Sequence, residues 1–364
     1  MSRSSPKAIG LRGCDFRTCS MNILNDREKT ILNNIVHSYI ETAIPVGSRY
    51  IAKRKDIGLS PATIRNVMSD LEYLGYLGHP HTSAGRIPTD KGYRFYVNEL
   101  MEIDQLSQKD QNSIQTQLQG NIETDEILKI ASKILGTISH QLSVVTAPQM
   151  TTGVFEKLEL LQVSSTRLLV IISIRTGLVK TIMMEIHSEI PRSKLDHVAQ
   201  LLNERLSGLT LNEIRNTFAE RIREFKNEDS GLIRLFIESV DKLFDENRKE
   251  KIHISGTTNI LSQPEFENAK NFKSVIELMD NEDIIIHVLQ TGDIKGGMAN
   301  VTIGEETKIE NLKDFSIVTK TYNVGGVTGT IGVLGPKRME YSKMIPLVDF
   351  VATTISDLFE NKGQ

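Results

Sequence analysis

The apolar residues between positions 59 and 77 repeat with the spacing of an α-helix. Four of them recur at intervals of three and four residues, which places them on one side of a helix. They are Ile64, Val67, Met68 and Leu71. Ser60 can cap the start of this helix, and Pro61 suits the first helical position, where its missing N–H needs no partner. The pattern therefore predicts a short amphipathic helix that begins at Pro61.

Two further helices are predicted ahead of it. Asp26 can cap a first helix, which Ile44-Pro45 ends. The apolar stripe of that helix consists of Leu32, Ile35, Val36, Tyr39 and Ile40. Ser48 then begins a short helix that runs to Lys55, and Gly58 supplies a turn. A helix, a turn that contains glycine and a second helix together form a helix-turn-helix motif.

The segment after the helix at Pro61 has the pattern of a β-hairpin. Tyr76-Leu77 ends one arm, residues 78–85 form a polar tip bounded by glycines, and Arg86-Ile87 starts the return before Pro88. A recognition helix followed by a two-stranded wing is the layout of a winged helix-turn-helix, whose helix enters the major groove of DNA. The alternative interpretation is an ordinary amphipathic helix followed by a surface hairpin.

The polar side of the helix at Pro61 supplies the candidate DNA contacts. Arg65 and Asn66 are of the types that pair with guanine and adenine edges through two hydrogen bonds, so we expect them to read bases. Small or hydroxyl side chains near them allow close approach, namely Ser60, Ala62, Thr63 and Ser69. Arg86 in the wing, and Lys91 on a helix that Thr89 caps, are predicted to reach the DNA backbone. A solvated helix face explains Lys91 equally well.

Beyond residue 103 the hydrophobic pattern changes its period several times. Residues 104–123 are rich in Gln, Asn, Ser and Asp and are predicted to be a linker, and residues 124–142 return to helical spacing. The predicted strands are 154–163, 167–174, 178–186, 252–255, 283–289, 298–303, 315–321 and 328–334. Further helices are expected at 264–279 and 341–359.

This order of elements predicts an α+β multidomain protein. Residues 189–251, between the two sets of strands, are expected to be helical, with a capping box at residues 210–213. They would form an insertion into one α/β domain that consists of residues 124–188 and 252–364. Their apolar stripe is broad for a small helical block, so we expect it to contact a second copy of the chain. The stripe consists of Leu232, Leu235, Phe236, Val240, Leu243 and Phe244.

The composition is that of a globular protein with room for two or three domains. The chain has 364 residues, of which 39% are hydrophobic. No apolar run reaches the ~18 residues that span a membrane, and residues 1–20 hold no apolar block that would make a secretory signal. We therefore expect a cytoplasmic protein whose leader, residues 1–20, is disordered or an artefact of the assigned start. Both cysteines, Cys14 and Cys19, lie in that leader and support no disulfide framework.

The net charge of −3 conceals a basic N-terminal region. Residues 48–94 carry eight Lys or Arg against four acidic residues, whereas residues 101–364 have a net charge of −8. A basic head on an acidic body fits a DNA-binding domain, residues 21–103, that is attached to other domains.

Two long stretches of the N-terminal region resemble the HrcA family, whose members are bacterial repressors of heat-shock chaperone operons. They are PATIRNVMSDLEYLGYL at 61–77 and PHTSAGRIPTDKGYRFYV at 80–97. The resemblance continues through FEKLELL, VTIGEE and GTIGVLGPKRMEYSKMIPLVDFVA, and covers nearly all of the chain after Met21. It implies a GAF-like domain interrupted by a dimerisation domain, and repression through an inverted-repeat operator upstream of chaperone genes. It also implies release on heat shock and an activity that a GroEL-type chaperonin supports.

Catalytic and ligand-binding alternatives have less support in the residues. No Ser/His/Asp or Cys/His grouping can be argued from spacing, so we expect no enzyme and no cofactor. His79 and His81 have no Cys or acidic partners nearby and make a weak metal site. Gly326, Gly329, Gly332 and Gly335 match no phosphate-binding loop and are interpreted as strand and turn glycines. The alternative function is a winged-helix regulator controlled by a small molecule in its GAF-like domain.

Overall fold

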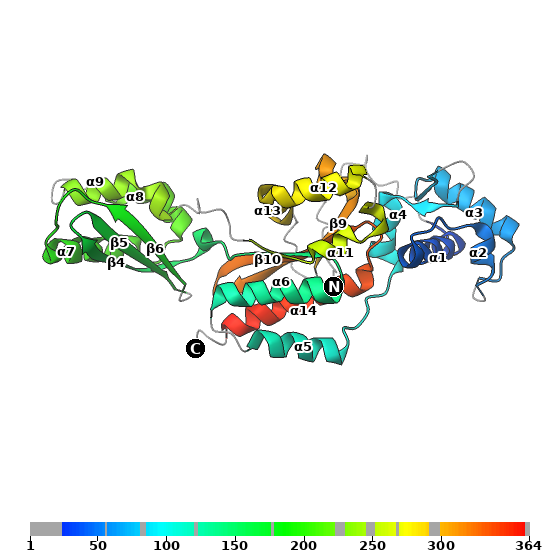
Figure 1. Ribbon diagram of the computed structural model, residues 1–364, viewed down its shortest axis with the longest axis horizontal. Coiled ribbons are helices and arrows are strands. Elements are labelled where there is room, and N and C mark those ends of the chain that lie inside the picture. Colours follow the sequence, from blue (N-terminus) through cyan, green and yellow to red (C-terminus); the bar gives the residue numbers. More distant parts are fainter. Residues whose placement is uncertain are drawn as a thin grey trace, which may run out of the picture. The chain divides into compact units, whose positions relative to one another are not determined.

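The computed structural model describes residues 24–54, 57–80, 85–119, 123–175, 178–222, 230–244, 252–266, 269–290 and 299–360 (Figure 1). The chain divides into two units, residues 1–96 and residues 97–364. The leader expected at residues 1–20 lies outside the described residues. Within the described ranges, no helix is both long enough and apolar enough to span a membrane.

The first unit has the helices and the hairpin that the hydrophobic pattern predicts. Its elements are α1 (Asp26–Thr42), α2 (Ser48–Ala52), α3 (Pro61–Tyr73), β1 (Leu77–Gly78), β2 (Ile87–Pro88) and α4 (Asp90–Phe95). A π-helical turn, Tyr96–Leu100, follows. The cap of α1 is Asn25 and not Asp26, because Asn25 accepts the N–H of Glu28 while the Glu28 carboxylate accepts the N–H of Asn25. This reciprocal pair satisfies two backbone donors at the helix start.

The wing is tied to the loop between α1 and α2. β1 and β2 pair antiparallel, and Arg86 also pairs with Val46, the N–H of each donating to the carbonyl of the other at 2.9 Å. A Cβ on Gly85 would come within 2.6 Å of the Val46 carbonyl carbon, so the contact needs a residue without a side chain. The predicted hairpin is confirmed at its base, whereas residues 81–84 of its tip lie outside the described part.

The second unit contains a five-stranded antiparallel sheet. Its strands, in spatial order, are β7 (Ile252–Ser255), β3 (Leu142–Thr146), β10 (Val327–Pro336), β9 (Phe315–Val324) and β8 (Asn300–Ile303). Gly325 and Gly326 join β9 to β10 with φ values of 56° and 98°, which a two-residue hairpin turn requires. The regularly spaced glycines are therefore turn and strand residues, as the sequence indicates.

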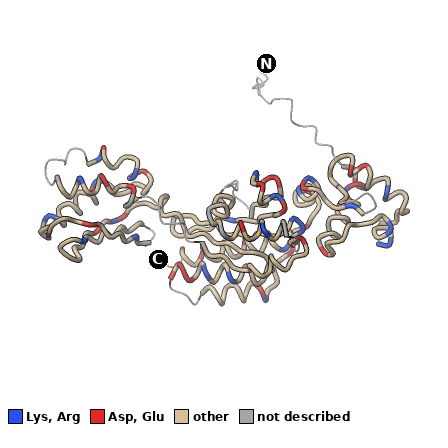
Figure 2. Tube along the Cα trace, turned by 45° about the horizontal axis from the view of Figure 1, so that its top comes forward, with Lys and Arg blue, Asp and Glu red and all other residues tan. Residues whose placement is uncertain are grey.

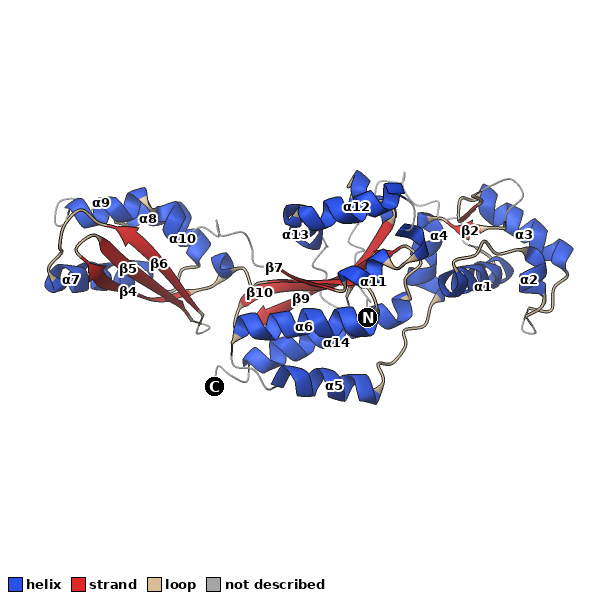
Figure 3. Cartoon of the chain, in the orientation of Figure 1, coloured by secondary structure: helices blue, strands red, loops and turns tan. Residues whose placement is uncertain are grey.

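Helices cover both faces of this sheet (Figures 1 and 3). On one side lie α5 (Gln108–Gln119), α6 (Thr124–Ser139) and α14 (Tyr341–Glu360), and on the other α11 (Thr257–Leu261), α12 (Ala269–Asp280) and α13 (Glu282–Gln290). The core beneath α12 and α13 includes Val144 of β3 and Ile317 of β9. Their neighbours Val145 and Val318 are also fully buried. Because successive strand residues point to opposite faces, both faces of the sheet are apolar.

The segment predicted as a linker, residues 104–123, carries helix α5. Ile114 and Leu118 lie one turn apart, both are fully buried, and the helix packs against α6 and α14. The abundance of Gln, Asn and Ser concealed this pair, although Gln is a good helix former. Asp104 is fixed as well, since its carboxylate accepts a 2.7 Å hydrogen bond from the Ser342 hydroxyl.

A second, three-stranded sheet corrects the predicted insertion. Its strands β4 (Phe155–Ser164), β5 (Arg167–Ile174) and β6 (Val179–Glu185) pair with one another and, within the described ranges, with no strand of the five-stranded sheet. The helices that follow are α7 (Arg192–Leu206), α8 (Leu211–Arg221), α9 (Ser230–Glu238) and α10 (Val240–Phe244), and α7 packs on β4. The helices expected within 189–251 are present, but the predicted boundary of the insert is wrong, because strands assigned to residues 124–188 form a separate sheet that packs with these helices. Strand periodicity identifies a strand but not the sheet that it joins.

Two predictions of secondary structure in the second unit are wrong. Residues 283–289 form helix α13 and not a strand, because an apolar run of that length suits either element. The helix predicted for 124–142 ends at Ser139, where His140 takes a left-handed φ of 52°, and β3 begins at Leu142. The strands predicted within 252–255, 298–303, 315–321 and 328–334 are confirmed.

Replacing Leu118 with Ala tests whether α5 belongs to the folded core. The variant should be less stable by roughly 2–5 kcal/mol, since it loses a fully buried leucine side chain. Urea unfolding followed by circular dichroism measures this loss. Gln115→Ala changes an exposed residue of the same helix and should stay within about 0.5 kcal/mol of the parent. Equal stability of the two variants would restore the linker interpretation.

Candidate nucleic-acid interface

The orientation of α3 is fixed by its cap and by its apolar side. The hydroxyl of Ser60 accepts the N–H of Thr63 at 3.1 Å, and the two hydroxyl oxygens lie 2.9 Å apart. Ile64 and Leu71 are fully buried, and Val67 and Met68 nearly so. Ser60 and Thr63, predicted as DNA contacts, therefore also start the helix.

The predicted reading face of α3 lies open to solvent. Ala62, Arg65, Asn66 and Ser69 are all exposed. Within the described residues, neither Arg65 nor Asn66 forms a hydrogen bond or an ion pair through its side chain. Their donors and acceptors are consequently available to the edges of bases.

Tyr73 is a candidate contact that sequence reasoning missed. It ends α3, and its side chain is 91% exposed. Its spacing from Ala62, Asn66 and Ser69 places it on the same side of the helix, and this spacing is the signal that could have identified it. A tyrosine hydroxyl at that position can donate to a phosphate oxygen.

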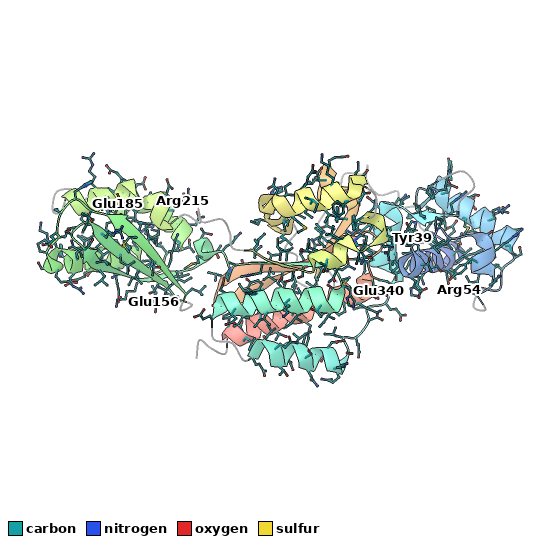
Figure 4. The ribbon with its side chains drawn as sticks, viewed as in Figure 1. Tyr39, Arg54, Glu156, Glu185, Arg215 and Glu340 are labelled. Carbon is teal, nitrogen blue, oxygen red and sulfur yellow. The ribbon has the colours of Figure 1, made fainter. Side chains whose placement is uncertain are left out.

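Sequence reasoning also missed three exposed residues on α2 and just after it that could contact DNA. Arg49 and Tyr50 of α2, and Lys53 just after it, are exposed, and Figure 2 shows the Lys and Arg positions in blue. Arg54, labelled in Figure 4, instead donates to the side chain of Asn34 at 2.9 Å and so ties α2 to α1. The first helix of a helix-turn-helix crosses the DNA backbone, which makes Arg49 and Lys53 candidates for phosphate contact.

Arg86 has a partner within the chain. Its Nη2 lies 2.6 Å from Oε2 of Glu72 on α3, and its side chain is only 24% exposed. His79, in the other arm of the wing, contacts Oε1 of the same carboxylate through Nδ1. In this structure the guanidinium of Arg86 therefore binds Glu72 on α3, whereas the sequence analysis expected it to contact a DNA phosphate.

Lys91 also contacts the protein itself. Its ammonium group donates to the carbonyl of Leu74 at 2.8 Å and lies 4.3 Å from the centre of the Tyr76 ring. A cation at this position satisfies a carbonyl at the end of α3 and is favoured by the helix dipole. Burial raises the pKa of Tyr76, and the carboxylate of Glu28 adds to the increase. This role of Lys91 could not be predicted from the hydrophobic pattern, because its partners lie 15 to 17 positions earlier in the chain.

The described part of the chain shows no metal site, and the core of the five-stranded sheet has no room for a ligand. The described residues contain no cluster of three His, Cys, Asp or Glu side chains that could hold a metal, and His81 lies outside them. Between the five-stranded sheet and α12–α13, a cavity of about 10 Å³ is lined by apolar side chains such as Val144, Leu278 and Ile317. A space of that size holds at most one water molecule. A separate pocket of about 510 Å³ lies between residues 185–191 and helix α9.

The apolar stripe predicted for dimerisation lies mostly inside the chain. Leu232, Phe236, Leu243 and Phe244 are buried, and the rings of Phe244 and Phe218 lie 5.5 Å apart. Leu235 and Val240 are partly exposed. The four buried side chains therefore form the core beneath the helices and offer no surface to another molecule.

Comparisons with known proteins agree with this geometry. The family described as "Winged helix-turn-helix transcription repressor, HrcA DNA-binding" matches residues 23–102, and "HrcA protein C terminal domain" matches residues 125–345. The heat-inducible transcription repressor HrcA of Chlorobium phaeobacteroides (strain BS1) is 41% identical over 344 residues, covering 92% of this chain and 97% of that protein. Its namesake from Chlorobium luteolum is 42% identical over 352 residues, covering 92% and 98%.

A solved structure has a similar fold. The crystal structure of a hypothetical protein shares 25% of its sequence with this chain and aligns with a TM-score of 0.56. The alignment covers 93% of this chain and 99% of the chain in that crystal structure. The chain therefore belongs to the HrcA family of heat-inducible transcription repressors, and its first unit is the DNA-binding winged helix of that family.

Proposed function

We propose that this protein represses chaperone operons from the cytoplasm by binding an inverted-repeat operator as a dimer, and that heat stress releases it. The observation that carries the DNA-binding part is the exposed side of α3. Arg65 and Asn66 there have no partner within the described residues, while the opposite side of the helix is buried. The operator, the heat response and support by a GroEL-type chaperonin rest on family membership and resemblance.

The roles in DNA binding divide between two helices. Arg65 and Asn66 read base edges in the major groove, since each can form two hydrogen bonds to one base. Arg49 of α2 and Lys53 just after it neutralise phosphates and contribute affinity that is independent of the DNA sequence.

The dimer is proposed to form through the open face of the three-stranded sheet. Leu161 lies opposite Leu169, which lies opposite Met183, so these three form one row across β4, β5 and β6. Leu161, Val163, Val179 and Met183 are each between 42% and 55% exposed. An apolar face of this kind marks an interaction site.

A second copy of the chain is the occupant that fits this face. Arg167 lies opposite Glu185, labelled in Figure 4, and gives the apolar row a polar edge. A two-fold dimer would present two copies of α3 to two half-sites, as an inverted repeat requires. Linking the two heads also raises the effective concentration of the second at its half-site.

Control by a small molecule in the central, GAF-like domain is the alternative function. The described residues leave only about 10 Å³ between the sheet and α12–α13. A metabolite would have to separate those helices from the sheet, and Phe266 and Phe315, stacked with centroids 4.8 Å apart, resist this. The packing therefore favours the heat-responsive repressor.

Replacing Arg65 with Ala tests base readout. The variant should lose about 1–3 kcal/mol of affinity for the operator and much less for random DNA, because a base-specific pair is removed. Gel shifts over a salt series measure both affinities. Arg49→Ala is the matched control, and it should weaken both DNAs alike and reduce the salt slope by about one. Equal losses for Arg65→Ala on the two DNAs would reduce its role to a phosphate contact.

Replacing Leu161 and Met183 with Glu tests the dimer surface. The variant should be a folded monomer that holds the full operator weakly, since charge on the apolar row opposes its burial. Light scattering and a gel shift on the same sample report both properties. Ile44→Glu changes an exposed apolar residue of the first unit and should leave the dimer intact. A dimeric Leu161/Met183 variant with normal binding would place the interface elsewhere.

Mild heating tests the stress response. Purified protein should lose operator binding when warmed and should recover more of it with chaperonin and ATP than with chaperonin alone. Operator binding before and after each treatment is the measurement. Recovery that requires an added metabolite instead would favour the small-molecule regulator.

A further inference from the structure

One carboxylate of α3 contacts both arms of the wing. Glu72 lies on the flank of the helix, between its buried and exposed sides, and is 26% exposed. Its Oε2 accepts from Arg86 at 2.6 Å, and its Oε1 lies against Nδ1 of His79. His79 follows β1 and Arg86 precedes β2, so a single side chain connects the recognition helix with the outgoing and the returning strand.

Arg86 is held in the orientation that this contact needs. Its backbone forms two hydrogen bonds with Val46, and Gly85 beside it has no room for a side chain. Within the described residues, the Nε atom of Arg86 is buried without a hydrogen-bond partner, so the guanidinium has already lost much of its contact with water. An ion pair that is partly withdrawn from solvent interacts more strongly than one at the surface, and loss of one partner leaves the other poorly compensated.

A different set of contacts holds the segment after the wing. Thr89 donates to the carbonyl of Gly75 at 2.7 Å, and Lys91 donates to that of Leu74. These bonds anchor the start of α4 to the end of α3, but they involve neither arm near the tip. Backbone bonds tie Arg86 to Val46, and among the side-chain contacts of the described residues those of Glu72 join α3 to both arms of the wing.

We propose that Glu72 is a positioning residue that sets the wing at a fixed angle to α3, so that helix and wing meet DNA together. The proposal rests on the DNA binding proposed above. A wing that is oriented before binding loses less conformational freedom when the complex forms, which increases affinity without a new contact. The pairing with Arg86 also neutralises a carboxylate that would otherwise lie uncompensated beside the DNA backbone.

The Glu72→Gln variant tests the proposal in the full-length protein. We expect its operator affinity to fall roughly two- to tenfold, because a wing that is not held in advance has to be ordered when DNA binds. Hydroxyl-radical footprinting should show that protection by the wing is lost while protection at the bases under α3 remains. Asp70→Asn removes the same charge from an exposed position of α3 and should leave the wing footprint intact.

A double-variant cycle separates positioning from general electrostatics. Because Glu72 acts through Arg86, Glu72→Gln combined with Arg86→Gln should lose no more affinity than the more affected single variant. An unchanged wing footprint in Glu72→Gln would overturn the proposal. So would tighter binding by both Glu72→Gln and Asp70→Asn, since it would mean that each carboxylate merely repels phosphate. If wild-type protein binds no operator, it is the proposed function that fails.

The Arg86→Lys variant provides the test if Glu72→Gln does not fold. It keeps the charge but cannot reproduce the planar guanidinium contact. A footprint weakened at the wing alone supports positioning, and an unaltered footprint with unaltered affinity contradicts it.

Discussion

Burial of one side of α3 is the constraint on which the rest of the DNA-binding unit depends. Because Ile64 and Leu71 are packed against the body of the unit, the helix cannot rotate, and its polar side must face outward. The cap at Ser60 fixes where that side begins, and the bond from Lys91 fixes where it ends. The exposed positions are thus determined by the residues that bury one side of the helix and by those that bind its two ends.

Local features were predictable from the sequence, whereas partners distant along the chain were not. The cap at Ser60 and the capping box at Thr210 involve residues three positions apart, and both form as the pattern indicates. Arg86 and Lys91 were correctly placed on the wing and on the next helix. Their partners, however, lie 14 to 17 positions away and depend on how the chain turns, so the sequence suggested DNA contacts where the fold forms internal bonds.

The same limit explains the errors in the second unit. Residues 167–174 are recognisable as a strand from the sequence, because their buried apolar side chains alternate with less buried ones. Whether that strand joins the five-stranded sheet or a second one depends on long-range packing, which periodicity does not encode. Leu118 was overlooked for a related reason, since a few apolar residues among many polar ones form a buried side only when other helices are there to cover it.

The open face of β4–β6 has a consequence for the separated chain. In the proposed dimer, Leu161 and Met183 are covered, but in a lone subunit these apolar side chains are exposed to water. A subunit in that state is prone to aggregate, and exposed apolar surface of this kind is what folding chaperones bind. Dissociation would therefore lower the avidity for the operator and produce a chaperone substrate in one step. Since dimerisation follows mass action, both effects would also depend on the cellular concentration of the repressor itself.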